Sequence, residues 1–320
     1  MLVITATPDA PAFITSPAFS GVIPPMPMRG TRVSADTSRM SDRPTTRPDD
    51  PRVGVVLPVL DEADNLRLLL PVLSELGPIG NGGTGLVDQL VVVDGGSSDD
   101  SLEVVCALAP DAVVVEQPRS GKGNALVAGL EVLAERGLDI GVTLDVDGSA
   151  DPHEIEDFRR ALLAGADYAK GSRLVEEGGS EDLTPVRAWG NRQLTRAFNL
   201  AFDADITDLC YGYNALWLDQ LPLLDLPDPG DLRPRRGCGC PEEQSAPTSS
   251  DADEEQRWGD GFEIETLLCC RFVKADREVV EVPSFEHDRV HGESHLSAVG
   301  DGLRVIETVR RERQDRQAVT

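Results

Sequence analysis

Lysine is scarce in this chain of 320 residues, which contains only Lys122, Lys170 and Lys274. Acidic residues outnumber basic ones by 56 to 30, and the formal net charge is −26. A general nucleic-acid binder needs the opposite balance, so that class of partner is excluded. An acidic, lysine-poor surface suits a salt-rich cytoplasm, because salt screens the self-repulsion that opposes folding. We therefore expect a halophilic source.

Long apolar segments are also missing. A transmembrane helix would require a run of about 18 apolar residues, and the chain has none. The N-terminus lacks the basic region, continuous apolar segment and cleavage site of a signal peptide. We therefore expect a cytoplasmic protein. Its 40% of hydrophobic residues can form the core of one large α/β domain or two smaller ones.

The six cysteines do not suggest a disulfide framework, because they include a vicinal pair and a Cys-x-Cys and a cytoplasmic setting disfavours bridges. Cys238, Cys240, Cys269 and Cys270 could supply four thiolates to zinc, although their spacing differs from the usual Cys-x2-Cys. We expect unligated thiols.

Composition divides the chain into four parts. Residues 1–50 are rich in Pro, Thr, Ser and Ala and predict a disordered tail. Residues 51–313 form the folded domain, and 314–320 are a C-terminal tail. Within the domain, residues 227–257 are rich in Pro, Gly, Ser and acidic residues, which predicts a mobile insertion.

Apolar strand patterns alternate with helical patterns along the first half of the domain. The expected strands are 53–57, 89–94, 112–116 and 141–144. This alternation predicts a single Rossmann-like, mostly parallel sheet with helices on both faces.

Polar residues follow each of these strands. They are Asp61 and Glu62, then Asp94, then Arg119 and Lys122, then Asp145 and Asp147. Ligands of open parallel sheets bind at the carboxyl ends of the strands, so we expect these side chains to converge on one site.

Asp145 and Asp147 are two residues apart at the end of the fourth strand. If the strand continues through them, both side chains point to the same side. Two carboxylates there suit Mg²⁺ or Mn²⁺ carrying a diphosphate. The alternative is a solvated acidic turn.

The last segment has apolar residues at helical spacing, flanked by arginines. The apolar positions are Leu296, Val299, Leu303 and Ile306, and the arginines are Arg304, Arg310, Arg311 and Arg313. Two interpretations remain open: a helix that packs on the core through this stripe, or a basic amphipathic helix on an anionic membrane surface.

The order of the polar motifs resembles the family 2 glycosyltransferases, and within them the dolichyl-phosphate mannosyltransferase-like branch. The motifs are Pro58-x-x-Asp61-Glu62-x-x-Asn65, Val93-Asp94-Gly-Gly-Ser97, Gly121-Lys122-Gly-x-Ala125, Asp145-x-Asp147, Gly171-Ser-Arg173, Asn191-Arg192, Gly261-Phe-Glu263-x-Glu265 and Arg289-Val-His-Gly292-Glu-Ser294. The resemblance covers residues 53 to 311 and depends on the joint order, because each motif alone is weak.

The resemblance implies a GT-A fold, a UDP- or GDP-linked sugar donor, and Mg²⁺ or Mn²⁺. Pro58, Glu62 and Asp94 would line the nucleoside pocket, and Lys122 would help to hold that end of the donor. Asp147 would bind the metal.

By the same resemblance, Asp145 would lie on the ribose or sugar side, next to the metal. Arg289 and His291 would face the diphosphate or an acceptor phosphate, and Arg192 is a further candidate for the acceptor phosphate. Together, the metal bound by Asp147 and the Arg289 side chain would neutralise the leaving diphosphate.

A hydroxyl acceptor would need a general base, for which Asp260 and Glu263 are the candidates, whereas a phosphate acceptor would need none. The chain departs from the family at Gly95 and Ser149, where Asp and Gln are usual. His287 is a candidate metal ligand that could compensate for Ser149.

The leading interpretation is a metal-dependent glycosyltransferase acting on a polyprenyl phosphate, peripherally at the inner face of a membrane. The alternatives are transfer to a small soluble acceptor, as in glucosyl-3-phosphoglycerate synthases, and an inactive sugar-nucleotide-binding or scaffold protein.

Overall fold

The computed structural model describes the chain except for residues 1–29, 32–46, 79–82, 236–255, 293–297 and 319–320. The expected tail at 1–50 and the expected mobile insertion therefore lie largely outside the described residues. Of the tail, Gly30–Thr31 forms strand β1, and of the insertion, Arg233–Arg235 forms strand β9.

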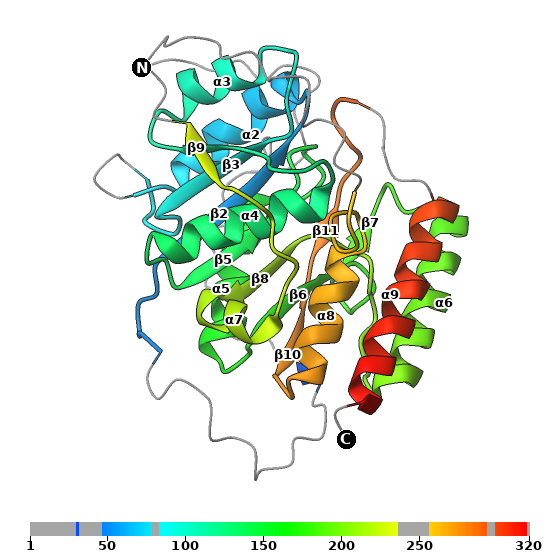
Figure 1. The fold of residues 1–320 in the computed structure, drawn as a ribbon. Helices are drawn as coiled ribbons and strands as arrows, with labels where there is room; N and C mark the ends of the chain where they lie inside the picture. Colours follow the sequence, from blue (N-terminus) through cyan, green and yellow to red (C-terminus); the bar gives the residue numbers. More distant parts are fainter. Residues whose placement is uncertain (1–29, 32–46, 79–82, 236–255, 293–297, 319–320) are drawn as a thin grey trace.

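One nine-stranded sheet forms the centre of the molecule, in the order β1-β10-β6-β8-β5-β2-β3-β4-β9 (Figure 1). Between the two short edge strands lie β2 (Val53–Val59), β3 (Gln89–Asp94), β4 (Val113–Glu116), β5 (Ile140–Thr143), β6 (Tyr168–Ser172), β8 (Asn214–Trp217) and β10 (Val279–Pro283). Strand β8 runs antiparallel to both neighbours, while β5, β2, β3 and β4 pair in parallel. The predicted mostly parallel sheet is confirmed.

Helices cover both faces of this sheet, as expected for buried parallel strands. They are α2 (Ala63–Glu75), α3 (Ser101–Leu108), α4 (Lys122–Glu135), α5 (Ile155–Leu163), α6 (Pro185–Phe202), α7 (Leu221–Leu224), α8 (Ile264–Lys274) and α9 (Ala298–Ala318). One core cluster joins the sheet to α2, α3 and α5, and a second joins it to α4, α6, α8 and α9. The flanking-helix architecture is confirmed, and the fold is of the GT-A type.

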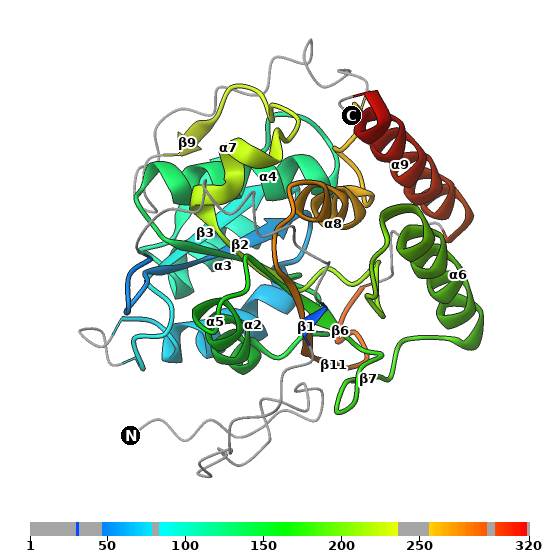
Figure 2. The same cartoon turned by 90° about the horizontal axis from the view of Figure 1, so that it is seen from below.

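Helices α6 and α9 pack side by side at the edge of the molecule, beyond α8 (Figures 1 and 2). The inner face of α9 carries Val305, Thr308, Val309 and Glu312, all buried. Leu303 and Ile306 are 62% and 51% exposed, so the stripe expected to pack on the core is wrong for these two positions. The buried face instead includes the charged Glu312, which pairs with Arg271 and Lys274 of α8.

The cysteines are only partly as expected. Cys269 and Cys270 are free and buried inside α8, where burial raises the pKa of Cys269 to about 12, so its thiol stays protonated. Cys238 and Cys240 lie outside the described residues, so the expectation of unligated thiols is not tested there. Cys106 is disulfide-bonded, and the expectation of an unligated thiol is wrong there. Within the described part of the chain, no helix is both long and apolar enough to cross a bilayer.

Candidate active site

The loops that follow β2 and β3 are bound to each other. Asp61 adopts a left-handed φ of 55°, and its Oδ1 accepts the backbone N–H of Ser98 at 2.7 Å. Asp94 is 1% exposed and accepts the backbone N–H of Ser97 at 2.9 Å. Glu62 accepts a hydrogen bond from the Asn65 amide at 2.5 Å. With Pro58 inside β2, this arrangement leaves a row of carboxylates at one edge of the sheet.

Lys122 begins α4 and reaches across to the end of β5. Its Nζ lies 2.8 Å from Asp145 Oδ2 and 2.9 Å from Glu265 Oε1. Burial alone would lower the pKa of Lys122, but the two carboxylates raise it above its usual value, so the ammonium stays charged. Sequence reasoning gave Glu265 no role, although this buried side chain holds the lysine.

Asp147 lies opposite Arg289, whose Nη2 is 3.1 Å from Asp147 Oδ2. Backbone contacts hold residues 287–292, here called the late loop, in place. The His287 N–H donates to Ser149 O at 2.8 Å, and the Val290 N–H donates to Asp147 O at 3.3 Å. The side chain of His291 is exposed, while its carbonyl accepts the Asn65 amide at 3.3 Å. The late loop therefore crosses the strand ends.

Strand β5 ends at Thr143, so Asp145 and Asp147 lie in the following loop and not in a continuing strand. Their carboxylates are held by different cations, Lys122 and Arg289, and not as a preformed pair. The expected geometry of two residues on one strand face is corrected accordingly.

A divalent cation would not find a complete protein cage here. Among the described residues, no three His, Cys, Asp or Glu side chains are grouped to hold a metal. The His287 ring lies 3.4 Å from Glu181 and packs on Phe285 at 4.9 Å. Mg²⁺ is commonly bound by one or two carboxylates together with substrate phosphates, so Asp145 and Asp147 still fit such an ion.

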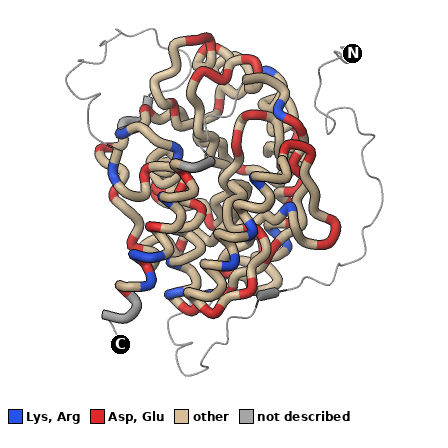
Figure 3. Tube along the Cα trace, turned by 90° about the vertical axis from the view of Figure 1, so that its right-hand side faces the viewer, with Lys and Arg blue, Asp and Glu red and all other residues tan. Residues whose placement is uncertain are grey.

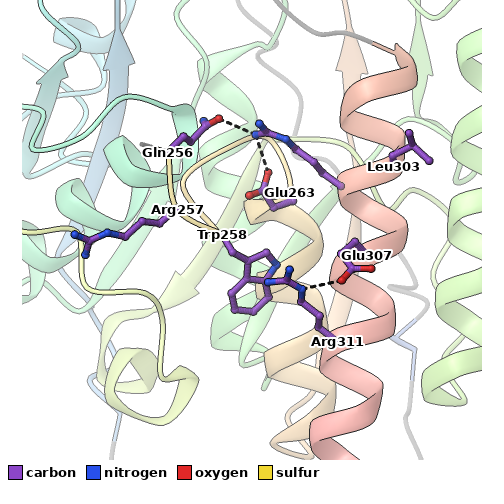
Figure 4. Close-up of a pocket in the computed structure, with 8 residues that line it drawn as sticks. Gln256, Arg257, Trp258, Glu263, Leu303, Glu307 and Arg311 are labelled. Carbon is purple, nitrogen blue, oxygen red and sulfur yellow. Dashed lines mark hydrogen bonds and ion pairs between the residues drawn. The ribbon is translucent and has the colours of Figure 1, made fainter. Parts of the chain in front are cut away.

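Both candidate bases have buried partners. The Asp260 carboxylate is 2% exposed and forms a bidentate pair with Arg119 at 3.0 Å for each contact. Glu263 accepts the backbone N–H groups of Gly259 at 2.9 Å and Gly261 at 3.4 Å through Oε1, and its Oε2 lies 3.7 Å from Arg304. Figure 4 shows Glu263 facing α9, in a cavity of about 330 Å³ beside Trp258.

Two arginines of the motifs lie further along the chain. Arg192 is exposed on α6. Arg173, to which sequence reasoning gave no role, pairs with Asp208 at 2.7 Å and Glu286 at 3.0 Å. Burial would lower the pKa of Arg173, but these carboxylates raise it. Its position directly after β6 could have indicated a role, because the predicted site residues also follow the ends of strands.

Comparison with known proteins supports one family. Residues 54–219 match the model of glycosyl transferase family 2. The polyprenol monophosphomannose synthase of Mycolicibacterium smegmatis is 32% identical over 196 residues, which cover 58% of this chain and 68% of that protein. The undecaprenyl-phosphate mannosyltransferase of Micrococcus luteus is 27% identical over 266 residues, covering 81% and 93%.

The fold also resembles that of solved structures. Glucosyl-3-phosphoglycerate synthase from Mycobacterium tuberculosis, in complex with Mn²⁺, UDP and glucosyl-3-phosphoglycerate, superposes with a TM-score of 0.54 at 21% identity, covering 83% of this chain and 85% of that one. The chain is therefore a glycosyltransferase that belongs to glycosyl transferase family 2, in its dolichyl-phosphate mannosyltransferase-like branch.

Proposed function

We propose that the protein transfers a sugar from a UDP- or GDP-linked donor to a polyprenyl phosphate at a membrane surface, with Mg²⁺ or Mn²⁺. The observation that carries the proposal is the grouping of Lys122, Asp145, Asp147 and Arg289 at one edge of the sheet. Two carboxylates with two basic side chains suit a diphosphate and its cation. We assign the nucleoside to the neighbouring ends of β2 and β3.

The chemistry breaks the bond between the anomeric carbon and the diphosphate, and forms one to an acceptor phosphate oxygen. Negative charge develops on the leaving nucleoside diphosphate, which Arg289 can neutralise by charge-assisted hydrogen bonds. A divalent cation, when bound, supplies Lewis-acid neutralisation of the same charge, with Asp147 and Asp145 as its protein ligands.

The state of the two candidate bases favours a phosphate acceptor. Asp260 is held by Arg119, and Glu263 binds two backbone N–H groups and faces Arg304. These contacts within the protein occupy both oxygens of Asp260 and Oε1 of Glu263, so less of either carboxylate is left to take a proton from an acceptor hydroxyl. A phosphate acceptor is already an anionic nucleophile, so transfer to it requires no proton removal.

An exposed apolar surface on α6 and α9 supports a lipid-linked acceptor. Val186, Trp189 and Leu200 of α6 are 77%, 65% and 84% exposed. Helix α6 carries three arginines and no acidic residue, in a chain of net charge −26. Figure 3 views this side of the molecule. Exposed apolar side chains among arginines complement an anionic bilayer surface, so we propose peripheral contact through these two helices.

A second candidate is a small soluble acceptor. The glucosyl-3-phosphoglycerate synthase of Mycolicibacterium paratuberculosis is 40% identical over 103 residues, which cover 30% of this chain. An acceptor with a free hydroxyl would need a base, and the contacts of Asp260 and Glu263 disfavour it.

Mn²⁺-dependent transfer from a panel of UDP- and GDP-sugars tests the proposal, with a short-chain polyprenyl phosphate and 3-phosphoglycerate as competing acceptors. The proposal predicts transfer to the polyprenyl phosphate from one of these donors. Transfer to 3-phosphoglycerate alone would support the second candidate. Tight donor binding without turnover on either acceptor would indicate an inactive sugar-nucleotide-binding protein.

A further inference from the structure

Arg289 contacts the carboxylate of Asp147, the residue that would hold a divalent cation. Asp147 Oδ2 binds the guanidinium at 3.1 Å, and Asp147 Oδ1 accepts the backbone N–H of Ser149 at 3.1 Å. The Asp147 side chain is 8% exposed and that of Arg289 is 32% exposed. Both carboxylate oxygens are therefore engaged, and one of them by a positive charge.

The loop that carries Arg289 is held by contacts that do not involve its side chain. His287 N–H and Val290 N–H donate to the backbone of the Asp147 loop, and Asn65 donates to the His291 carbonyl. The guanidinium can therefore leave Asp147 while the loop stays close to the strand ends. Its partial exposure gives it room to turn toward a bound ligand.

A divalent cation that binds Asp147 without a donor would lie next to Arg289. The cation and the guanidinium would repel each other, because both are positive, and the repulsion is stronger in a partly buried site than in water. A diphosphate removes this conflict, because its oxygens accept both the metal and the fork of the guanidinium. Arginine suits the exchange, since carboxylate and phosphate match its bidentate geometry equally well.

We propose that Arg289 is the cation of Asp147 in the donor-free enzyme, and that the divalent cation and the nucleoside diphosphate bind as one unit. On donor binding, Asp147 would exchange its contact with Arg289 for the metal, and Arg289 would contact the diphosphate. The inference rests on the proposed function for the identity of the ligand. It adds that the enzyme has little affinity for the metal alone.

Direct Mn²⁺ binding to the full chain, measured by the loss of the free-ion electron paramagnetic resonance signal, tests this without turnover. In the wild type, UDP or GDP should tighten Mn²⁺ binding by about tenfold or more. Arg289→Met should bind Mn²⁺ alone about tenfold more tightly than the wild type and should lose most of the nucleotide effect. Arg289→Lys keeps the charge and should resemble the wild type in Mn²⁺ binding alone.

Arg160→Met is the matched control, because Arg160 pairs with Glu156 and Asp157 on the exposed face of α5. It removes one positive charge from the same acidic chain and should leave Mn²⁺ affinity unchanged. If Arg289→Met and Arg160→Met bind Mn²⁺ equally tightly while the wild type still binds nucleotide, the inference about Arg289 is wrong and the proposed function is unaffected. Absence of UDP and GDP binding in the wild type would instead overturn the proposed function.

Discussion

The substitution Asp260→Asn separates a structural role of this carboxylate from a catalytic one. Asn has the same shape but no charge, so the buried Arg119 guanidinium would lose the carboxylate that it binds through two nitrogens. The two side chains are 2% and 4% exposed, and Asp260 also accepts the Arg257 backbone N–H at 2.9 Å. The pair joins the loop before α4 to the loop before α8.

Breaking a buried ion pair by removing one partner costs about 3–5 kcal/mol. In a domain of this size, 1 kcal/mol corresponds to roughly 2–4 °C in Tm, so Asp260→Asn should lower the Tm by about 6–20 °C. Equilibrium urea denaturation provides the free energy of unfolding directly. The double variant Arg119→Met with Asp260→Leu removes both charges and should recover most of the loss.

A general base would behave differently. Its substitution would abolish sugar transfer while leaving the free energy of unfolding within about 1 kcal/mol of the wild type. That result for Asp260→Asn, with no recovery in the double variant, would refute the structural assignment.

Two further predictions concern pH and salt. Burial raises the pKa of Glu154 from 4.5 to about 7. Because the pKa of Glu154 is higher in the folded than in the unfolded state, this residue should reduce the free energy of unfolding as pH rises from about 4.5 to 7, by up to about 3 kcal/mol. Urea denaturation of Glu154→Gln across this pH range should not show that decrease. The net charge of −26 predicts a higher Tm in molar KCl than at low salt, and an unchanged Tm would contradict the halophilic interpretation.

The local pattern of this sequence determines much of its fold. The strand at Gln89–Asp94 begins and ends where it was predicted. Its signal is strong, because an apolar run ends there in Asp94. The convergence of polar strand ends follows from the parallel sheet alone.

The remaining features depend on partners that are distant in sequence. Arg119 and Asp260 are 141 residues apart, and nothing near Asp260 in sequence reveals that it is paired. The buried face of α9 was missed because it includes Glu312, whose burial depends on cations supplied by α8. The role of Glu265 depends similarly on Lys122 at the start of another helix.

The central claim is that Asp147, in the loop after β5, is an essential ligand of the donor and its cation. The measurement that tests it most directly is Mn²⁺-dependent sugar transfer by Asp147→Asn, alongside its urea denaturation. We expect transfer to be lost while the free energy of unfolding falls by only about 1–2 kcal/mol, because Arg289 is partly exposed and its charge can be hydrated. Near-normal turnover with Mn²⁺ would contradict the account.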